Sequence, residues 1–433
     1  MPEKTTPNRP VRPSGSSCRF CFAPLSLSVV DLGTSPLCQK HVRPEDAKKA
    51  EHFFPLHAYV CRECWLMQLE DFASPEEIFT GEYAYFSSYS DSWLEHARNY
   101  TARMVERFGL GQDSLVVEAA SNDGYLLQYF LERGIPVLGI EPAANVAAAA
   151  REKGVRTEGL FFGQEAARRL SAQYGKANLL VGNNVLAHVP DINDFVGGMK
   201  AMLAVNGVIT MEFPHLQRLI EGNQFDTIYH EHYSYLSLVA ANRIFAHHGL
   251  TLFDVEELPT HGGSLRIFAC HTEGLIRPVS DNVGALLERE RRLGMESPEY
   301  YADFEARVKE TKRRLLEFLI GAKRDGKTVV GYGAPGKGNT LLNYCGIRTD
   351  FLDFTVDRNP HKQGNFLPGT RIPIYHPEAI KAARPDYVII LPWNLKEEIS
   401  RQLSYIEEWG GKMVVPIPEV QVLEKAVVRQ EVY

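Results

Sequence analysis

Short apolar runs alternate with segments of helical periodicity through the middle of the chain. The runs span residues 115–120, 137–142, 178–184 and 207–213. Between them, apolar positions recur at helical spacing in residues 125–133, 145–153 and 195–203. Short apolar runs are typical of buried strands, and strand–helix alternation predicts a mostly parallel sheet with helices on both faces. We therefore expect a doubly wound α/β domain over residues 76–270.

A second region of the same kind follows a charged stretch. Residues 283–325 interleave Glu and Arg, which predicts a long solvated helix or a helix pair. Four further strand patterns occur at residues 327–334, 352–357, 387–393 and 412–418. They predict a second doubly wound domain, so that residues 271–433 hold a helical linker and a C-terminal α/β domain.

The first 75 residues show neither the short apolar runs nor the helical spacing of the later regions. Residues 1–17 are rich in Pro, Ser and Thr and poor in apolar side chains, which predicts a disordered tail. Residues 18–75 contain two C-x-x-C pairs and short extended segments at 26–31 and 58–61, which indicate a small β-rich module.

The paired cysteines predict a metal site in this module. Two C-x-x-C turns present four thiolates, formed by Cys18, Cys21, Cys61 and Cys64, which is the ligand set of a closed tetrahedral zinc site. A closed site has no open position, so this zinc would be structural. The alternative, four unrelated buried thiols, does not explain the pairing. Cys38 lies between the pairs and is interpreted as a packing residue, with replacement of a ligand as the alternative.

The predicted fold class is therefore α/β, with a small β-rich zinc module followed by two doubly wound, Rossmann-like α/β domains. The net charge of -7 gives no electrostatic reason to bind nucleic acid. No run of about 18 apolar residues occurs, so no membrane span is expected. Because an apolar secretory segment is also missing from the start, we expect a cytoplasmic protein. Its oligomeric state is open, and a monomer is compatible with the sequence.

The segment V-V-E-A-A-S-N-D-G-Y-L-L, residues 116–127, combines a strand, a small-residue turn and a helix start. Open α/β sheets bind nucleotides at this edge, and an acidic residue ending the next strand can accept ribose hydroxyls. The turn lacks the G-x-G-x-x-G glycines that admit a pyrophosphate, so S-adenosylmethionine fits better than a dinucleotide. The alternative is a plain strand-to-helix connection. The predicted cofactor contacts are Glu118, Ala120, Asn122, Asp123, Gly124, Glu141, Asn183 and Asn184.

Residues 225–236, F-D-T-I-Y-H-E-H-Y-S-Y-L, concentrate imidazoles, phenols and carboxylates. In an extended segment His230 and His232 would face the same way, whereas in a helix Tyr229 and His232 would share a face. An imidazole is the natural general base near neutral pH, and a phenol can donate to a developing enolate oxygen. His188 could add a polar contact from a neighbouring loop. A polar network that braces two domains is the alternative.

The C-terminal region contains a glycine-rich loop, G-Y-G-A-P-G-K-G-N-T, at residues 331–340. Its glycines, Lys337 and the following helix start could form an anion cradle. A Walker ATPase loop is excluded because Gly338 follows Lys337. The alternative is a degenerate nucleotide fold used only for packing.

Together these motifs resemble the sugar C-methyltransferases of deoxysugar biosynthesis. The resemblance covers about residues 18–420. It is carried by the two cysteine pairs, E-x-A-S-N-D-G-Y-L-L from Glu118, N-N-V-L-A-H-V from Asn183, Y-H-E-H-Y-S-Y from Tyr229, H-G-G-S-L-R from His261 and G-Y-G-A-P-x-K-G-N-T from Gly331. The family has a zinc domain, a cofactor domain and a C-terminal α/β domain, and it binds a nucleotide-linked 4-ketosugar between the last two.

The resemblance implies roles for particular residues. His232 would remove the proton beside the ketone, at carbon 3 as in most of the family or at carbon 5 as the alternative, and Tyr229 would stabilise the enolate. His188, Tyr83 and Glu231 would lie near the sugar. The implied substrate contacts are His261, Arg266, Gly333, Lys337 and Asn339. The rival functions are an O- or N-methyltransferase on another small molecule, a non-enzymatic zinc-ribbon scaffold and an NAD-dependent sugar dehydrogenase.

Overall fold

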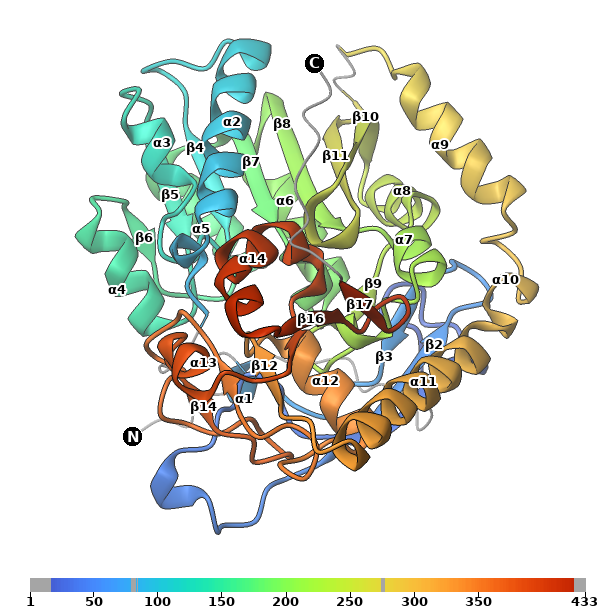
Figure 1. Ribbon diagram of the computed structural model, residues 1–433. Coiled ribbons are helices and arrows are strands. Elements are labelled where there is room, and N and C mark those ends of the chain that lie inside the picture. The colour runs from blue at the N-terminus through green and yellow to red at the C-terminus, as the bar shows by residue number, and fades with distance from the viewer. Residues whose placement is uncertain (1–16, 79–82, 84, 274–276, 424–433) are drawn as a thin grey trace, which may run out of the picture.

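The protein is described here as a computed structural model that covers residues 17–78, 83, 85–273 and 277–423 (Figure 1). The expected tail, residues 1–17, falls outside the described residues except for Ser17. Three sheets organise the described chain. Among the described residues, no helix combines the length and apolar character needed to cross a membrane.

The middle sheet has seven strands in the order β10-β11-β8-β7-β4-β5-β6. The five strands β8, β7, β4, β5 and β6 are parallel to one another. Strand β11 is antiparallel to both of its neighbours, β8 and β10. The four predicted strands are present, and the β10–β11 hairpin extends the sheet beyond them. The strands are β4 (Val116–Ala119), β5 (Val137–Ile140), β6 (Thr157–Glu158), β7 (Ala177–Asn183), β8 (Leu203–Pro214), β10 (Leu250–Leu258) and β11 (Ser264–His271).

Helices cover both faces of the middle sheet. Apolar residues of α2 and α3 pack on one face, and those of α5, α6 and α8 pack on the other. Ser90 begins α2 by accepting a hydrogen bond from the Trp93 amide, and left-handed Gly109 ends it. The helices are α2 (Asp91–Phe108), α3 (Leu127–Leu131), α4 (Ala144–Glu152), α5 (Gln164–Tyr174), α6 (Ile192–Met202), α7 (Leu216–Glu221) and α8 (Leu238–His247).

The charged stretch forms α9 (Asp281–Arg292), α10 (Glu299–Ala302) and α11 (Phe304–Arg324), which lead to the C-terminal sheet (Figure 1). That sheet has the order β14-β13-β12-β15-β16-β17, and only β17 is antiparallel to its neighbour. Its strands and helices are β12 (Val329–Tyr332), α12 (Gly336–Cys345), β13 (Thr355–Val356), β14 (Ile374–Tyr375), α13 (Glu378–Ala383), β15 (Tyr387–Ile390), α14 (Lys396–Gln402), β16 (Lys412–Val415) and β17 (Gln421–Leu423).

The N-terminal module is an antiparallel sheet in the order β1-β2-β3-β9. Its last strand comes from the middle of the chain, within the histidine- and tyrosine-rich segment. Short 3-10 turns include η3 (Leu186–His188), η4 (Phe225–Thr227), η5 (Thr260–Gly262) and η6 (Trp393–Leu395). The elements of the module are β1 (Leu27–Ser35), β2 (Phe54–Val60), β3 (Met67–Leu69), α1 (Pro75–Ile78) and β9 (Ser234–Tyr235).

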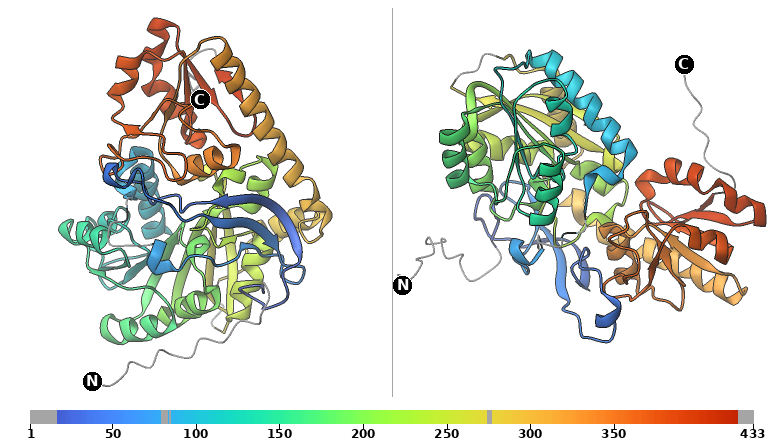
Figure 2. Two further views of the ribbon diagram at one scale, coloured as in Figure 1. Left: turned by 90° about the horizontal axis from the view of Figure 1, so that it is seen from below. Right: turned by 90° about the vertical axis from the view of Figure 1, so that its left-hand side faces the viewer.

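The N-terminal module and the C-terminal domain share one apolar core. Val30 of β1 and Leu56 of β2 belong to the same buried cluster as Phe304 of α11 and Leu341 of α12. In both views of Figure 2 the blue strands of the module lie beside the orange C-terminal elements and next to the green middle domain. The module therefore lies against both α/β domains.

Candidate active site

The four paired cysteines meet at one point. Their sulfur atoms all lie within 4.8 Å of one another, and the Cys18–Cys64 and Cys21–Cys61 sulfurs are 3.5 Å apart. The Gln68 amide donates to the Cys18 sulfur at 3.1 Å, as expected for a group that steadies a thiolate. Four soft donors of this kind fit a tetrahedral zinc ion and leave no position for a substrate.

The cofactor loop follows β4 with an irregular backbone. Ala120 and Asn122 have φ of 55° and 48°, and Gly124 has φ of 75°. Such left-handed residues turn the chain sharply, so the small side chains stand at the carboxyl edge of the sheet. Asn122 is also held from outside, because its side-chain oxygen accepts the Ser87 amide at 2.8 Å.

Two buried acids end neighbouring parallel strands. Burial raises the pKa of Glu118 well above its ordinary value and that of Glu141 to about 7. The Glu141 carboxylate accepts the amides of Asn122 at 3.0 Å and Ala143 at 2.8 Å. Each oxygen retains a second lone pair, so the carboxylate can still accept ribose hydroxyls.

Several polar atoms at this edge have no partner among the described residues, namely Ser121 Oγ and the side-chain oxygens Asp123 Oδ1, Asn183 Oδ1 and Asn184 Oδ1. Asn184 is left-handed, with φ of 53°, at the end of β7. Buried polar groups without partners are costly unless a ligand supplies them. The predicted cofactor residues therefore form one connected group that fits a polar ligand such as S-adenosylmethionine.

Between η4 and β9, the histidine- and tyrosine-rich segment is neither strand nor helix, and the chain turns there. The His232 amide donates to the Tyr229 carbonyl at 2.8 Å, and the rings of Tyr229 and His232 lie 4.0 Å apart. His230 points elsewhere, toward the Pro55 carbonyl at 3.1 Å. This part of the chain meets neither the helical nor the extended condition of the sequence analysis. The rings of Tyr229 and His232 nevertheless lie together, and His230 and His232 point in different directions because the chain turns between them.

His232 has a defined hydrogen-bonding state. Its Nδ1 lies 2.9 Å from the Thr227 carbonyl, which can only accept, so Nδ1 carries a proton. Burial, followed by the charge of His188, lowers the pKa of His232 well below its ordinary value. The ring is therefore neutral, and its Nε2 lone pair is free to accept a proton.

Glu231 is buried beside this pair. Its carboxylate oxygens lie 3.4 Å from the Cys38 sulfur and 3.5 Å from the Tyr83 hydroxyl. Burial raises the pKa of Glu231 to about 7. His188 lies edge-on to His232 at 4.6 Å, and burial lowers its pKa to about 4. The structure thus brings together His188, Tyr83, Tyr229, Glu231 and His232.

The C-terminal glycine loop adds a cation and an amide. Lys337 lies 4.6 Å from the Trp393 ring and donates to Asn394 at 2.8 Å. Asn339 is buried, and neither side-chain atom has a partner among the described residues. Gly333 has φ of 90°, and a Cβ there would meet Pro392 at 2.6 Å, so the turn requires glycine. The electrostatic influence of Lys337 reaches both His232 and His261.

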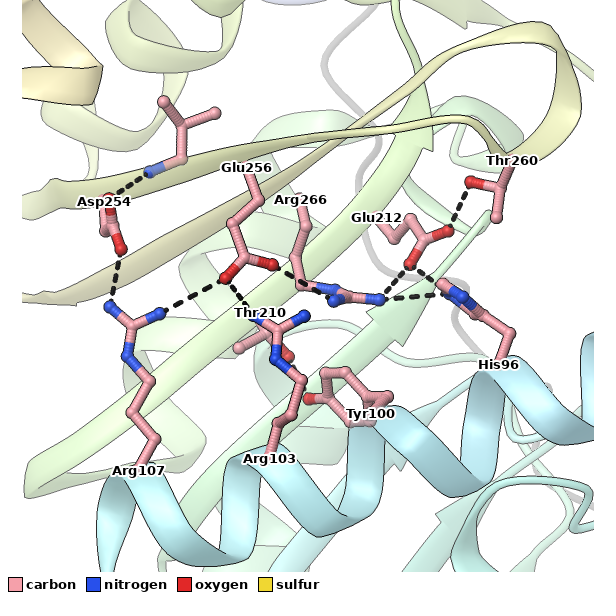
Figure 3. Close-up of polar contacts among 11 residues, drawn as sticks. His96, Tyr100, Arg103, Arg107, Thr210, Glu212, Asp254, Glu256, Thr260 and Arg266 are labelled. Carbon is pink, nitrogen blue, oxygen red and sulfur yellow. Dashed lines mark hydrogen bonds and ion pairs between the residues drawn. The ribbon is translucent and has the colours of Figure 1, made fainter. Parts of the chain in front are cut away.

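Arg266 lies inside a polar network between α2 and the β8–β11–β10 edge (Figure 3). Its guanidinium donates to Glu212 at 2.6 Å and Glu256 at 3.3 Å, and it packs over Tyr100. The side chain is 1% exposed. The expected substrate contact of Arg266 stays a prediction, and the structure gives this guanidinium protein partners instead.

The same network holds the loop of His261. Thr260 donates to the Glu212 carboxylate at 2.8 Å, and His261 is left-handed with φ of 55°. Trp93 stacks on His96 and meets the His261 ring edge-on at 5.1 Å. Burial lowers the pKa of His261 to about 4. Glu212 therefore links Arg266 to the loop that carries His261.

Several contributors were not anticipated from the sequence. The sequence predicts a packing role for Cys38, yet its thiol lies within hydrogen-bond distance of Glu231. Asp226 accepts the Trp393 indole at 2.7 Å and so joins the turn to the C-terminal domain. Asp226 lies in a segment already singled out for its polar residues, whereas nothing in the local pattern of Cys38 or Trp393 indicated a site.

Three family models match consecutive parts of the chain. Residues 18–79 match a putative zinc binding domain, residues 93–255 a methyltransferase domain, and residues 259–418 a C-methyltransferase C-terminal domain.

Solved methyltransferase structures match part of the chain at low identity. Magnesium protoporphyrin IX methyltransferase of Synechocystis is 14% identical, with a TM-score of 0.32, over 41% of this chain and 79% of that chain. The 1,6-didemethyltoxoflavin-N1-methyltransferase of Burkholderia thailandensis is 18% identical, with a TM-score of 0.36, over 48% of this chain and 95% of that chain. The family assignment does not depend on these partial matches.

A full-length relative gives the assignment. C-methyltransferase NovU of Streptomyces niveus is 40% identical over 415 residues, which cover 95% of this chain and 98% of NovU. The aligned region of the two proteins includes the zinc module, the cofactor edge and the C-terminal domain. The chain therefore belongs to the family of S-adenosylmethionine-dependent C-methyltransferases with an N-terminal zinc-binding domain.

Proposed function

We propose that this C-methyltransferase acts on a nucleotide-linked 4-ketosugar, with carbon 3 as the methylated position. A sugar carbon becomes nucleophilic only when a neighbouring ketone acidifies its proton, so the reaction needs a base and a group that stabilises an enolate. S-adenosylmethionine, when bound, supplies the electrophilic methyl group. The remaining chemistry belongs to side chains of this protein.

His232 serves as the base. The observation that carries this proposal is the hydrogen bond between its Nδ1 and the Thr227 carbonyl, which leaves the Nε2 lone pair available. Because burial keeps the imidazole neutral, the base is ready at physiological pH. The proton of the sugar carbon moves to Nε2, and its electron pair forms the enolate.

Tyr229 stabilises the enolate oxygen. Its ring packs against His232 at 4.0 Å, and burial raises the pKa of the phenol well above its ordinary value, so the hydroxyl keeps its proton. A buried O–H donor is more effective than the same donor in water. Lys337 and the unpartnered amide of Asn339 supply polar groups for the rest of the substrate.

Deuterium exchange and mass spectrometry test this function together. Incubation with a panel of nucleotide-linked 4-ketosugars in deuterated water, without S-adenosylmethionine, is expected to place deuterium on the carbon beside the ketone. Adding the cofactor is expected to increase the product mass by one methyl group. An O- or N-methyltransferase would methylate without this exchange, and that result would overturn the proposal.

His232→Ala tests the base. Loss of a general base is expected to slow both exchange and methyl transfer by roughly 10²–10⁴-fold. Tyr229→Phe is expected to cost less, because it removes one hydrogen bond and leaves the base in place. Undiminished exchange in a folded His232→Ala variant that still binds S-adenosylmethionine would remove His232 from this role.

Cytoplasmic location remains a prediction from the sequence.

A further inference from the structure

Cys38 is the cysteine that stands between the two zinc-binding pairs. It is buried, and its sulfur lies 3.4 Å from Oε1 of Glu231, which is within reach of a thiol hydrogen bond. The Tyr83 hydroxyl lies 3.5 Å from the other oxygen, Oε2. One carboxyl group thus has a thiol on one oxygen and a phenol on the other.

The segment that carries Cys38 is fixed at both ends. Ser35 ends β1, and Val42 exchanges two backbone hydrogen bonds with Phe366 of the C-terminal domain, at 2.9 and 2.8 Å. Gly336 closes the remaining side, because a Cβ there would lie 2.9 Å from the Cys38 sulfur and 3.6 Å from Cζ of Tyr229. The thiol is therefore held in one position, between the turn that carries Tyr229 and His232 and the start of α12.

We propose that Cys38 is a positioning residue, whose thiol and the Tyr83 hydroxyl together fix the Glu231 carboxyl beside the Tyr229–His232 pair. The inference rests on the proposed function, because it assigns Glu231 a part in that reaction. It also gives the N-terminal module a second task, since the segment after β1 brings a donor into the site.

The chemistry of the thiol suits this task. Burial, and next the charge of Glu231, raise the pKa of Cys38 well above its ordinary value, so the thiol stays protonated and donates. The groups that face the Glu231 carboxyl are Cys38, Tyr83, Tyr229 and the more distant Lys362. The two hydrogen bonds favour its ionised form, so removal of the thiol is expected to raise the pKa of Glu231.

Infrared spectroscopy tests the contact without any substrate. The S–H stretching band of Cys38 is obtained as the difference between the wild-type protein and Cys38→Ala, both loaded with zinc. Glu231→Gln is expected to shift this band, because a carboxamide oxygen is a weaker acceptor than a carboxylate. Cys270→Ala is the matched control, a buried cysteine of β11 whose removal leaves the Cys38 band in place. A Cys38 band that is identical in the wild-type protein and in the Glu231→Gln variant would overturn the inference.

Enzyme kinetics test whether the Cys38 thiol controls the pKa of Glu231 during the reaction. In Cys38→Ala the acid limb of the kcat profile is expected to move to higher pH, and kcat at pH 7 is expected to fall by about tenfold, the worth of one hydrogen bond. Affinity for S-adenosylmethionine is expected to stay unchanged. Cys38→Ser retains a donor and is expected to recover part of the loss. A purely structural role would lower thermal stability without moving the pH profile.

Gly336→Ala provides a second variant in case Cys38→Ala folds poorly. The added methyl group is expected to displace the thiol and to move the acid limb in the same direction. If both variants keep the wild-type profile, the inference is wrong. If the wild-type enzyme itself shows no exchange with any 4-ketosugar, the proposed function fails, and the infrared result still decides whether Cys38 holds Glu231.

Discussion

The buried carboxylate of Glu212 in the middle domain is compensated by hydrogen bonds and an ion pair with individual neighbouring side chains. Glu212 is fully buried at the end of β8, and it accepts from Arg266, His96 and Thr260. Burial alone would raise the pKa of Glu212, but these partners outweigh it and lower the pKa to about 2. The ionised carboxylate therefore stabilises the folded domain and holds the His261 loop.

Glu212→Gln is expected to destabilise the middle domain by about 3–5 kcal/mol, because it leaves the Arg266 guanidinium buried without its closest countercharge. Denaturant unfolding at pH 7 measures the change. Glu256→Gln is the matched control, since Glu256 lies in the same network but its side chain is 20% exposed, and about 1 kcal/mol or less is expected. Equal losses in the two variants would contradict the role of burial.

The lowered pKa of Glu212 makes the folding stability depend on pH in a definite direction. A folded-state pKa below the ordinary 4.5 stabilises the protein above that pH, and the contribution is lost as pH falls toward about 2. Wild-type stability should thus decline over this range more steeply than that of Glu212→Gln.

At the scale of single elements, the cofactor loop depends on backbone geometry. Gly124 has φ of 75°, and a Cβ there would lie 2.9 Å from Val155. An L side chain in this conformation is strained, and the contact adds to the strain. The sequence indicated the turn through its small residues, but the left-handed positions became visible only in the structure.

Gly124→Ala is expected to weaken S-adenosylmethionine binding about tenfold or more and to cost about 1–2 kcal/mol of stability, because the loop must shift to relieve the strain. Titration calorimetry and thermal unfolding measure both effects. The control is Gly284→Ala in α9, where a Cβ meets nothing within 4 Å and helix propensity favours Ala. Unchanged affinity in Gly124→Ala would show that the loop tolerates the methyl group.

At the scale of the whole molecule, the zinc module connects the two α/β domains. Strand β9 belongs to the segment that carries His232, yet it completes the module's sheet by pairing with β3. Strands β1 and β2 share a core with α11 and α12. The module's sheet therefore connects the zinc site with the turn that carries His232.

Removal of zinc by a chelator is expected to increase amide hydrogen exchange in residues 228–235 and in α12, as well as around the cysteines, because the connecting sheet loses its anchor. Cys61→Ser should reproduce the effect, and Cys270→Ser in β11 serves as a control outside the zinc site and outside both measured segments. Faster exchange confined to residues 18–25 and 61–67 would show that the module acts alone.

The sequence by itself determined the metal ligands, the strand–helix alternation and the cofactor edge. These features are local, since C-x-x-C turns, apolar periods and small-residue turns each depend on neighbours along the chain. The pairing of Tyr229 with His232 was one of two local possibilities, and the turn between them decided it.

Only the tertiary structure decided the contacts that join distant segments. Cys38 meets Glu231 across 193 positions, Asp226 meets Trp393 across 167, and Arg266 is neutralised by Glu212 across 54. No local period encodes such contacts, because they depend on how three sheets pack against one another. Packing therefore places Cys38, for which the sequence predicts a packing role, beside Glu231, and it links Arg266 through Glu212 to the His261 loop.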